Sequence, residues 1–113
     1  MRLIELLEIT SESTNVFVRD TNGNDLAMYD GKNSIDEIFN NCKIIDMQIS
    51  DNWLVVIIEN NVKVVYDAEN DKYYTLENID NCSSQYVEIV YLVDVLEDAQ
   101  NGIPSARQFL FDL

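Results

Sequence analysis

Hydrophobic positions are densest between Ile44 and Tyr66, which reads IIDMQISDNWLVVIIENNVKVVY. The centre of this stretch, Trp53–Ile58, is six consecutive apolar residues, most of them β-branched or aromatic. A run this short, set between clusters of Asp, Asn and Ser, is typical of a strand buried on both faces. The flanking segments, Ile44–Ile49 and Val62–Tyr66, are predicted to pair with it antiparallel. The pattern therefore predicts a three-stranded meander with Trp53–Ile58 in the middle.

Further strands are predicted on both sides of this stretch, at Asn15–Arg19, Leu26–Tyr29, Tyr73–Leu76 and Tyr86–Val93. The first two are joined by Asn22-Gly23, a strong hairpin signal because both residues tolerate positive φ. In the last strand, alternate residues are apolar and are expected to point one way, with Glu88 pointing the other; they are Val87, Ile89, Tyr91 and Val93. This alternation is typical of a half-buried strand whose apolar row faces the core.

Short helices are predicted at Leu3–Glu8, Ile35–Asn40, Val95–Asn101 and, for a last turn or two, Ser105–Phe111. Ser34 and Glu37 have the spacing of a capping box, in which each side chain bonds the other residue's backbone N–H. Asp94 and Glu97 have the same spacing at the start of Val95–Asn101, and Gly102 suits the position just past its end.

These elements predict an α+β fold, with a mainly antiparallel β-sheet of about five to seven strands and two to four short helices. One domain is expected for residues 1–113, because this length is typical of a single domain. The last residues, Phe109–Leu113, are too apolar for a free tail. They are expected either to dock on their own core or to bury against a second copy in a homodimer.

The net charge of the chain indicates which kinds of partner it can bind. The chain carries 21 Asp and Glu against 7 Lys and Arg, with no His, for a net charge of −14. Such a chain is repelled by nucleic acid and by anionic membranes, and is attracted to basic surfaces. We therefore expect a basic, nucleic-acid-binding protein as partner, and no direct binding to nucleic acid or membrane. The alternative, that the acidity serves solubility alone, stays open.

After Lys72 the acidic residues are almost unopposed, with seven of them against Arg107 alone. Six of the seven are the predicted partner-binding residues: Glu77, Asp80, Glu88, Asp94, Glu97 and Asp98. A second acidic group lies between Asp20 and Glu37 and is relieved only by Arg19 and Lys32. Because ordered carboxylates repel one another, a fold that keeps them close is expected to use them against a basic partner.

No motif indicates catalysis, a metal or a cofactor, and we expect the protein not to be an enzyme. The absence of His removes most catalytic triads and zinc sites. Cys42 and Cys82 lie 40 residues apart, a spacing that fits neither a disulfide framework nor a metal site. Reduced thiols in a cytoplasmic protein are expected instead. No apolar run reaches transmembrane length, and from the opening residues, which include Glu5, we expect no secretion signal.

The opening residues, Met1 to Asp30, resemble the start of small, acidic, uncharacterised proteins encoded by phages and prophages of low-GC Gram-positive bacteria. The resemblance is carried by Leu3-Ile4-Glu5-Leu6-Leu7 and by the hairpin Val16-Phe17-Val18-Arg19-Asp20, Asn22-Gly23 and Leu26. Ile44–Ile49 resembles their next strand, so that about half of the chain is covered. Such proteins are often small inhibitors, anti-CRISPR proteins among them, and some mimic DNA. The resemblance implies no individual site residue.

Three hypotheses of function follow. In the first, the protein inhibits a nucleic-acid-handling host protein in the bacterial cytoplasm by occupying its basic surface, as a DNA mimic or anti-CRISPR-like inhibitor. In the second, it is an immunity or antitoxin protein that neutralises a toxic nuclease. In the third, it is a structural or assembly module that is acidic only for solubility.

Overall fold

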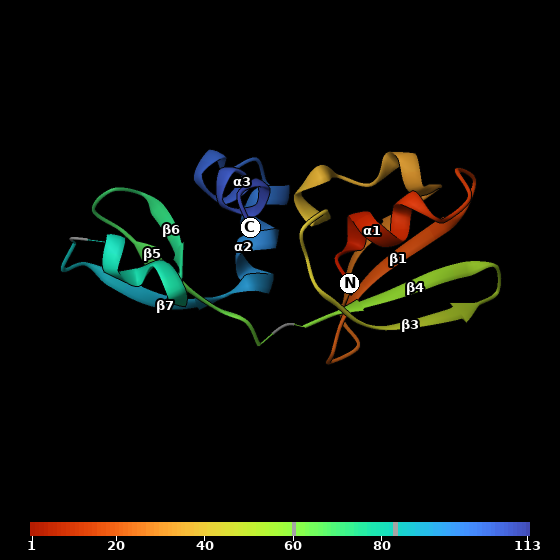
Figure 1. The fold of residues 1–113 in the computed structure, drawn as a ribbon, viewed down its shortest axis with the longest axis horizontal. Helices are drawn as coiled ribbons and strands as arrows, with labels where there is room; N and C mark the ends of the chain where they lie inside the picture. Colours follow the sequence, from red (N-terminus) through yellow and green to blue (C-terminus); the bar gives the residue numbers. More distant parts are fainter. Residues whose placement is uncertain (60, 83) are drawn as a thin grey trace. The chain divides into compact units, whose positions relative to one another are not determined.

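The computed structural model describes residues 1–59, 61–82 and 84–113, and the chain divides into two compact units, Met1–Asn60 and Asn61–Leu113. Each unit holds its own sheet and at least one α-helix (Figure 1). The predicted α+β class is confirmed, with seven strands and three α-helices among the described residues. The strands form two sheets, of four and three strands, where one sheet was expected. The expectation of one domain stays a prediction, and each unit is described by itself.

Unit 1 is built on a four-stranded sheet in the order β2-β1-β4-β3. Its elements in chain order are α1 (Leu3–Glu8), β1 (Asn15–Asp20), β2 (Asp25–Tyr29), the 3₁₀ helices η1 (Lys32–Ser34) and η2 (Glu37–Phe39), β3 (Ile44–Ser50) and β4 (Trp53–Ile58). The helix Leu3–Glu8 and the strands that flank Asn22-Gly23 are as predicted.

Strand β4 is an inner strand, but its neighbours are not those of the predicted meander. It pairs antiparallel with β3 and parallel with β1. The segment Val62–Tyr66, predicted as the third strand of the meander, instead belongs to β5 (Lys63–Asp67) of the second sheet. The meander was wrong because β1 takes that place: Val18 is fully buried directly opposite Val56, so burial of both apolar rows favours this pairing.

The core of unit 1 includes the fully buried side chains of Leu3, Val18, Phe39 and Val56, together with Ile58. Ile57 lies beside Ile58 on the opposite face of β4 and is only half-buried. The expectation that the whole run Trp53–Ile58 is buried on both faces therefore holds for some of its members only.

The helix predicted at Ile35–Asn40 is shorter than expected and is a 3₁₀ helix, η2, whose C-cap is Asn40. Ile35 has an extended backbone (φ −69°, ψ 127°), and only the single 3₁₀ turn η2 follows it. The capping box also fails, because the Ser34 hydroxyl donates to the carbonyl of Gly31 at 2.8 Å. Asp36 is the cap instead, with its carboxylate accepting from the N–H of Ile38 at 3.1 Å.

Unit 2 is built on the antiparallel sheet β6-β5-β7, with both α-helices in the C-terminal half of the unit. Its elements in chain order are β5 (Lys63–Asp67), β6 (Lys72–Thr75), the 3₁₀ helix η3 (Leu76–Asn81), β7 (Val87–Tyr91), α2 (Leu92–Gln100) and α3 (Pro104–Phe111). The two helices pack on each other, and α3 also packs on β6. Figure 1 shows β5 between the other two strands.

Strand β7 faces the opposite way from the prediction. Val87, Ile89 and Tyr91, expected to point to the core, are exposed, whereas Val90 is half-buried. The chain turns directly into α2 after Tyr91, and Val93 is helical rather than part of the strand. Leu92 and Val95 of α2, which follow the strand, are buried.

Helix α2 begins three residues earlier than predicted, and Asp94 is not its cap. The residue before the helix is Tyr91, which makes no side-chain cap, and Asp94 lies within the first turn. A carboxylate there still stabilises the helix through its dipole. The end is as predicted: Gly102 has φ +87°, and the N–H groups of Gly102 and Ile103 bond the carbonyls of Ala99 and Asp98 in a Schellman motif.

The C-terminal residues dock in part on their own unit. Leu110 is fully buried and Phe109 is 9% exposed, with the Phe109 ring 5.9 Å from that of Tyr73. Phe111 and Leu113 keep about two-fifths of their side chains exposed, at 42% and 40%. Self-association through these residues stays a prediction.

In both units a carboxylate at the end of a strand builds the hairpin turn. Buried Asp20 accepts from the N–H groups of Asn22 and Asn24 at 2.9 Å each, and from the Asn24 amide at 3.1 Å. Buried Asp67 accepts from the N–H of Glu69 at 3.0 Å and from the Asn70 amide at 2.8 Å. The hydrogen bond from the Asn70 side chain leads the causes that lower the pKa of Asp67, against its burial.

Truncation of Ile58 to Ala should destabilise unit 1 by about 2–5 kcal/mol, because it removes a buried large side chain and leaves a cavity. Ile57→Ala is the matched control and should cost clearly less, because that side chain is half-buried. Urea unfolding followed by the fluorescence of Trp53, the single Trp of the chain, measures both. Equal losses for the two variants would contradict the assignment of Ile58 to the core.

Acid should destabilise unit 2 through Asp67. Since the folded-state pKa of Asp67 lies below the ordinary 3.8, its stabilisation is complete above that pH and is lost as pH falls through the lower, folded-state pKa. The stability difference between wild type and Asp67→Asn should therefore shrink below about pH 4. Tyrosine circular dichroism during urea unfolding checks this, with exposed Asp80→Asn as control. A difference that stays constant down to the lowest pH would contradict the role of Asp67.

Candidate functional site: an acidic groove in unit 2

A groove of about 410 Å³ lies in unit 2. We call it the acidic groove and define it by its lining residues: Tyr66, Asp71, Tyr73, Glu88, Val90, Asp94, Val95, Asp98 and Ile103. The sheet supplies the two tyrosines, which lie directly opposite each other on β5 and β6 with ring centroids 4.7 Å apart. The chain segment around Ile103, between α2 and α3, completes the lining.

Four carboxylates from three parts of unit 2 line the acidic groove, and its lining includes no Lys or Arg. Asp94 and Asp98 are four residues apart on α2, so they share one face of the helix. Glu88 lies opposite Tyr66 across the β5–β7 pairing. Asp71 lies in the turn between β5 and β6 with φ +49°, a conformation that Asp tolerates better than most residues. The turn, the strand and the helix thus each contribute carboxylates to the lining of one groove.

Hydroxyl groups are the donors to these carboxylates. The Tyr66 hydroxyl donates to Asp71 Oδ1 at 2.8 Å, and the Ser105 hydroxyl donates to the same atom at 3.0 Å. The Tyr73 hydroxyl donates to Asp98 Oδ2 at 3.3 Å. These bonds orient two of the carboxylates without neutralising their charge.

The pKa values of both tyrosines are raised, by burial, by hydrogen bonds and by the charges of neighbouring carboxylates. Burial raises the pKa of Tyr73 to about 12, and the charge and hydrogen bond of Asp98 add to the effect. The hydrogen bond to Asp71 is the main cause that raises the pKa of Tyr66, with smaller effects from burial and from the charges of Asp71 and Glu88. Each carboxylate disfavours a further negative charge on the neighbouring ring.

The acidic groove brings together three of the six predicted partner-binding residues, Glu88, Asp94 and Asp98. Glu97 is exposed on α2, and Glu77 and Asp80 are exposed on η3, so these three do not line the groove. Sequence reasoning missed Asp71, Tyr66 and Tyr73. The sequence feature that could have predicted them is the short turn after Asp67. A hairpin at this turn pairs Tyr66 with Tyr73 and places Asp71 beside them.

The second acidic group, in unit 1, has local structural roles. Asp20 builds the β1–β2 turn and Asp36 caps η2. Arg19 pairs with Asp25 at 2.8 Å. These contacts account for much of that group, so the groove of unit 2 is the stronger candidate for binding.

Neither cysteine is among the residues that line the acidic groove. Burial raises the pKa of Cys42 to about 12, so this thiol is protonated and unreactive at neutral pH. The Cys82 thiol donates to Asp67 Oδ2 at 3.6 Å, which adds a weak bond to the β5–β6 turn. The described residues contain no group of three His, Cys, Asp or Glu placed to hold a metal ion.

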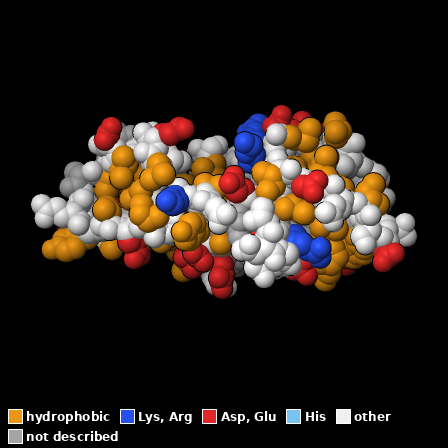
Figure 2. All heavy atoms as spheres, turned by 90° about the horizontal axis from the view of Figure 1, so that it is seen from below, with side chains coloured by type: hydrophobic (Ala, Val, Ile, Leu, Met, Phe, Trp, Pro, Cys, Tyr) orange, Lys and Arg blue, Asp and Glu red, His pale blue; other side chains and the backbone are white. Residues whose placement is uncertain are grey.

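No protein-family model matches the sequence, and no curated protein or solved structure is a significant match. Within the described ranges, no helix combines the length and hydropathy needed to cross a membrane. The case for function therefore depends on the residues of this chain. Figure 2 shows acidic side chains beside hydrophobic ones on one face of unit 2, in the left half of the view.

Replacement of Asp98 by Asn should lower the pKa of Tyr73 from about 12 toward the ordinary value of 10, because the variant removes a charge that opposes tyrosinate formation. An alkaline titration of tyrosinate absorbance measures this, with Tyr73→Phe identifying the relevant step. Glu77→Gln, which removes a charge outside the groove, should leave that step in place. An unchanged Tyr73 titration in Asp98→Asn would mean that the two side chains are not in contact in solution.

Proposed function

We propose that this protein is an acidic binding protein that inhibits a nucleic-acid-handling protein of a bacterial host by occupying its basic surface. The observation that carries the proposal is the acidic groove, whose lining residues include four carboxylates and no basic side chain. Unit 2 as a whole has 10 acidic residues against 3 basic ones. The proposal assigns the protein no catalytic activity and no cofactor.

The groove has the chemistry to receive Lys and Arg side chains. A carboxylate accepts charge-assisted hydrogen bonds from an ammonium or a guanidinium group, and Arg binds it in a bidentate manner. Tyr66 and Tyr73 offer aromatic faces to the same cations. A partner that normally binds phosphates with such side chains would find comparable acceptors here, and nucleic acid would then be excluded by charge and by volume.

Inhibition is the expected outcome of such binding. The basic residues that a nucleic-acid-binding protein uses for phosphates supply much of its affinity. An acidic protein that occupies them competes directly with the nucleic acid. Association should be fast at low salt and should weaken as salt rises, since exposed charges are screened beyond about 10 Å at 0.1 M ionic strength.

Capture from a bacterial lysate across a salt series tests the proposal. A basic nucleic-acid-binding protein should be retained at low salt and released at high salt, and the purified partner should lose nucleic-acid binding when this protein is added. The double variant Glu88→Lys with Asp94→Lys should greatly reduce capture. Glu77→Lys with Asp80→Lys is the matched control, because it changes the net charge equally outside the groove and should have a small effect.

Each other outcome counts against the proposal. Equal losses in both double variants would show that net charge alone matters, as expected for acidity that serves solubility. A captured toxic nuclease that is blocked at its active site would favour the immunity or antitoxin function. Recovery of no nucleic-acid-binding protein at any salt concentration would contradict the proposal directly.

A further inference from the structure

Strand β7 leaves one edge of the second sheet open. Its pairing with β5 is bounded by two hydrogen bonds of 2.9 Å, from the N–H of Ala68 to the carbonyl of Tyr86 and from the N–H of Leu92 to the carbonyl of Val62. In an antiparallel ladder such bonded positions alternate along the strand. Glu88 and Val90 therefore bond inward to β5, and three residues direct their N–H and C=O groups outward from the edge: Val87, Ile89 and Tyr91.

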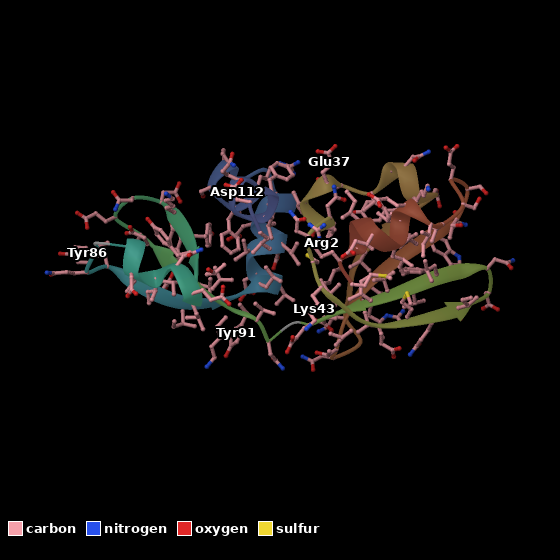
Figure 3. All side chains as sticks on the ribbon, viewed as in Figure 1. Arg2, Glu37, Lys43, Tyr86, Tyr91 and Asp112 are labelled. Atoms are coloured by element: carbon pink, nitrogen blue, oxygen red, sulfur yellow. The ribbon has the colours of Figure 1, made fainter. Side chains whose placement is uncertain are left out.

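The same three residues have exposed apolar side chains. Val87 is 44% exposed, Ile89 is 54% exposed and Tyr91 is 44% exposed. Figure 3 labels Tyr91 at the end of β7 and Tyr86, itself exposed, just before its start. In the part of the chain that the structure describes, no further strand pairs with β7, so its edge combines outward-directed backbone groups with a row of apolar side chains, which is the surface that an added strand requires.

The two faces of this edge differ in chemistry. Val87, Ile89 and Tyr91 share one face of the strand, and Glu88 and Val90 share the other, because side chains alternate. Glu88 and Val90 line the acidic groove. A strand that paired with β7 would therefore place every second side chain on the groove side and the remainder beside the apolar row.

The other sheet edges carry features that hinder strand addition. The β3–β4 pairing has a register shift between Ile44 and Asp46, and the N–H of Ile44 is already bonded to Met1. The β1–β2 pairing has a register shift as well, and α3 packs on β6. Strand β7 has five residues in unbroken register, with no Pro and no Lys. Strand β7 thus lacks Pro, Lys and a bulge, three of the devices by which natural sheets protect their edges, so its edge is accessible to an added strand.

We propose that the edge of β7 binds an extended segment of the partner protein, in which apolar residues alternate with Lys or Arg. The segment adds to the sheet as a fourth strand, its apolar side chains beside Val87, Ile89 and Tyr91. Its basic side chains lie on the Glu88 side and reach the acidic groove. This inference rests on the proposed function, because it names the part of the basic partner that the same groove receives.

Charge complementarity selects this occupant over a second copy of the chain. Antiparallel pairing of two β7 strands would place both acidic grooves on the same face of one continuous sheet. It would also join two chains that each carry a net charge of −14. A basic strand meets the same backbone edge with attraction in place of repulsion.

The test uses a fluorescently labelled peptide of the sequence Lys-Val-Lys-Ile-Lys-Val-Lys and the full-length protein. Two control peptides have Glu in place of Lys, or the same composition with all Lys residues first. The alternating peptide should bind more tightly than both, with fluorescence anisotropy as the measurement. Amide signals of Val87, Ile89 and Tyr91 should shift and become protected from hydrogen exchange when it binds.

Ile89→Pro removes an outward N–H that makes no bond to β5, so it should weaken peptide binding at least about tenfold while the sheet is retained. Ile89→Lys places a like charge on the edge and serves as a second variant should the Pro variant unfold. Ile9→Lys is its charge-matched control, at a residue of unit 1 that is 76% exposed, and should bind almost as wild type.

Failure of the inference and failure of the proposed function give different results. If both Ile89 variants bind the peptide as wild type does, while Glu88→Lys with Asp94→Lys does not, strand addition is overturned and charge binding by the groove stands. If the Ile89 variants lose the peptide but no nucleic-acid-handling protein is captured from lysate, strand addition is supported and the proposed function is not. Concentration-dependent dimerisation that Ile89→Pro abolishes would overturn the inference in favour of a second copy.

Discussion

The hydrogen bonds of two buried carboxylates, Asp20 and Asp67, hold the turns on which both units depend. The burial of a carboxylate without hydrogen-bond partners would cost more free energy than the net folding stability of a small unit. Both are satisfied by backbone N–H groups and by an Asn amide just ahead in the chain. In unit 2 the consequence reaches the groove, because the turn that Asp67 fixes also sets the position of Asp71 and the pairing of Tyr66 with Tyr73.

The acidic groove is a compromise between stability and binding. Like charges held close on folded elements repel one another, and unit 2 offsets part of that cost with hydroxyl donors. Tyr66, Tyr73 and Ser105 each donate to a groove carboxylate, which orients the oxygens and leaves their negative charge in place. A salt bridge would stabilise the fold more directly, but it would also occupy the acceptors that a basic partner needs.

Local signals in the sequence predicted much of the fold. The spacing of leucines predicted α1, Asn22-Gly23 predicted its hairpin, and Gly102 predicted the end of α2, since each depends on residues close in sequence. The capping predictions at Ser34 and Asp94 failed because the same spacing occurs without a helix starting there. The facing of β7 failed because alternation fixes which residues share a face and leaves open which face is buried.

The acidic character of the candidate site could be predicted from the sequence, and so could three of its carboxylates, Glu88, Asp94 and Asp98. Glu88 falls in a predicted strand and Asp98 in a predicted helix, whereas Asp94 was predicted as the cap just before that helix and lies in its first turn instead. Asp71 and the two tyrosines come together because β5 pairs with β6. The number and spacing of charged residues in the sequence do not predict that pairing. The split of the strands into two sheets escaped prediction for a similar reason, because the partner of β4 on its second side is distant in sequence.

The pairing of β4 with β1, which is distant in sequence, determines the order in which the strands of unit 1 can assemble. Every pair along the β1–β4 ladder joins residues 38 positions apart, as Asn15 and Trp53 show. Forming such a contact requires the chain to close a long loop. The loss of chain entropy comes before the stabilisation from apolar burial, and this slows folding. On the ribosome, β1 and β2 can meet early, but β4, the second inner strand of the sheet, is the last strand of unit 1 to emerge. A nascent chain therefore carries the exposed edge of β1 until Ile58 has been synthesised and released, and this is the interval in which unit 1 is most open to mispairing.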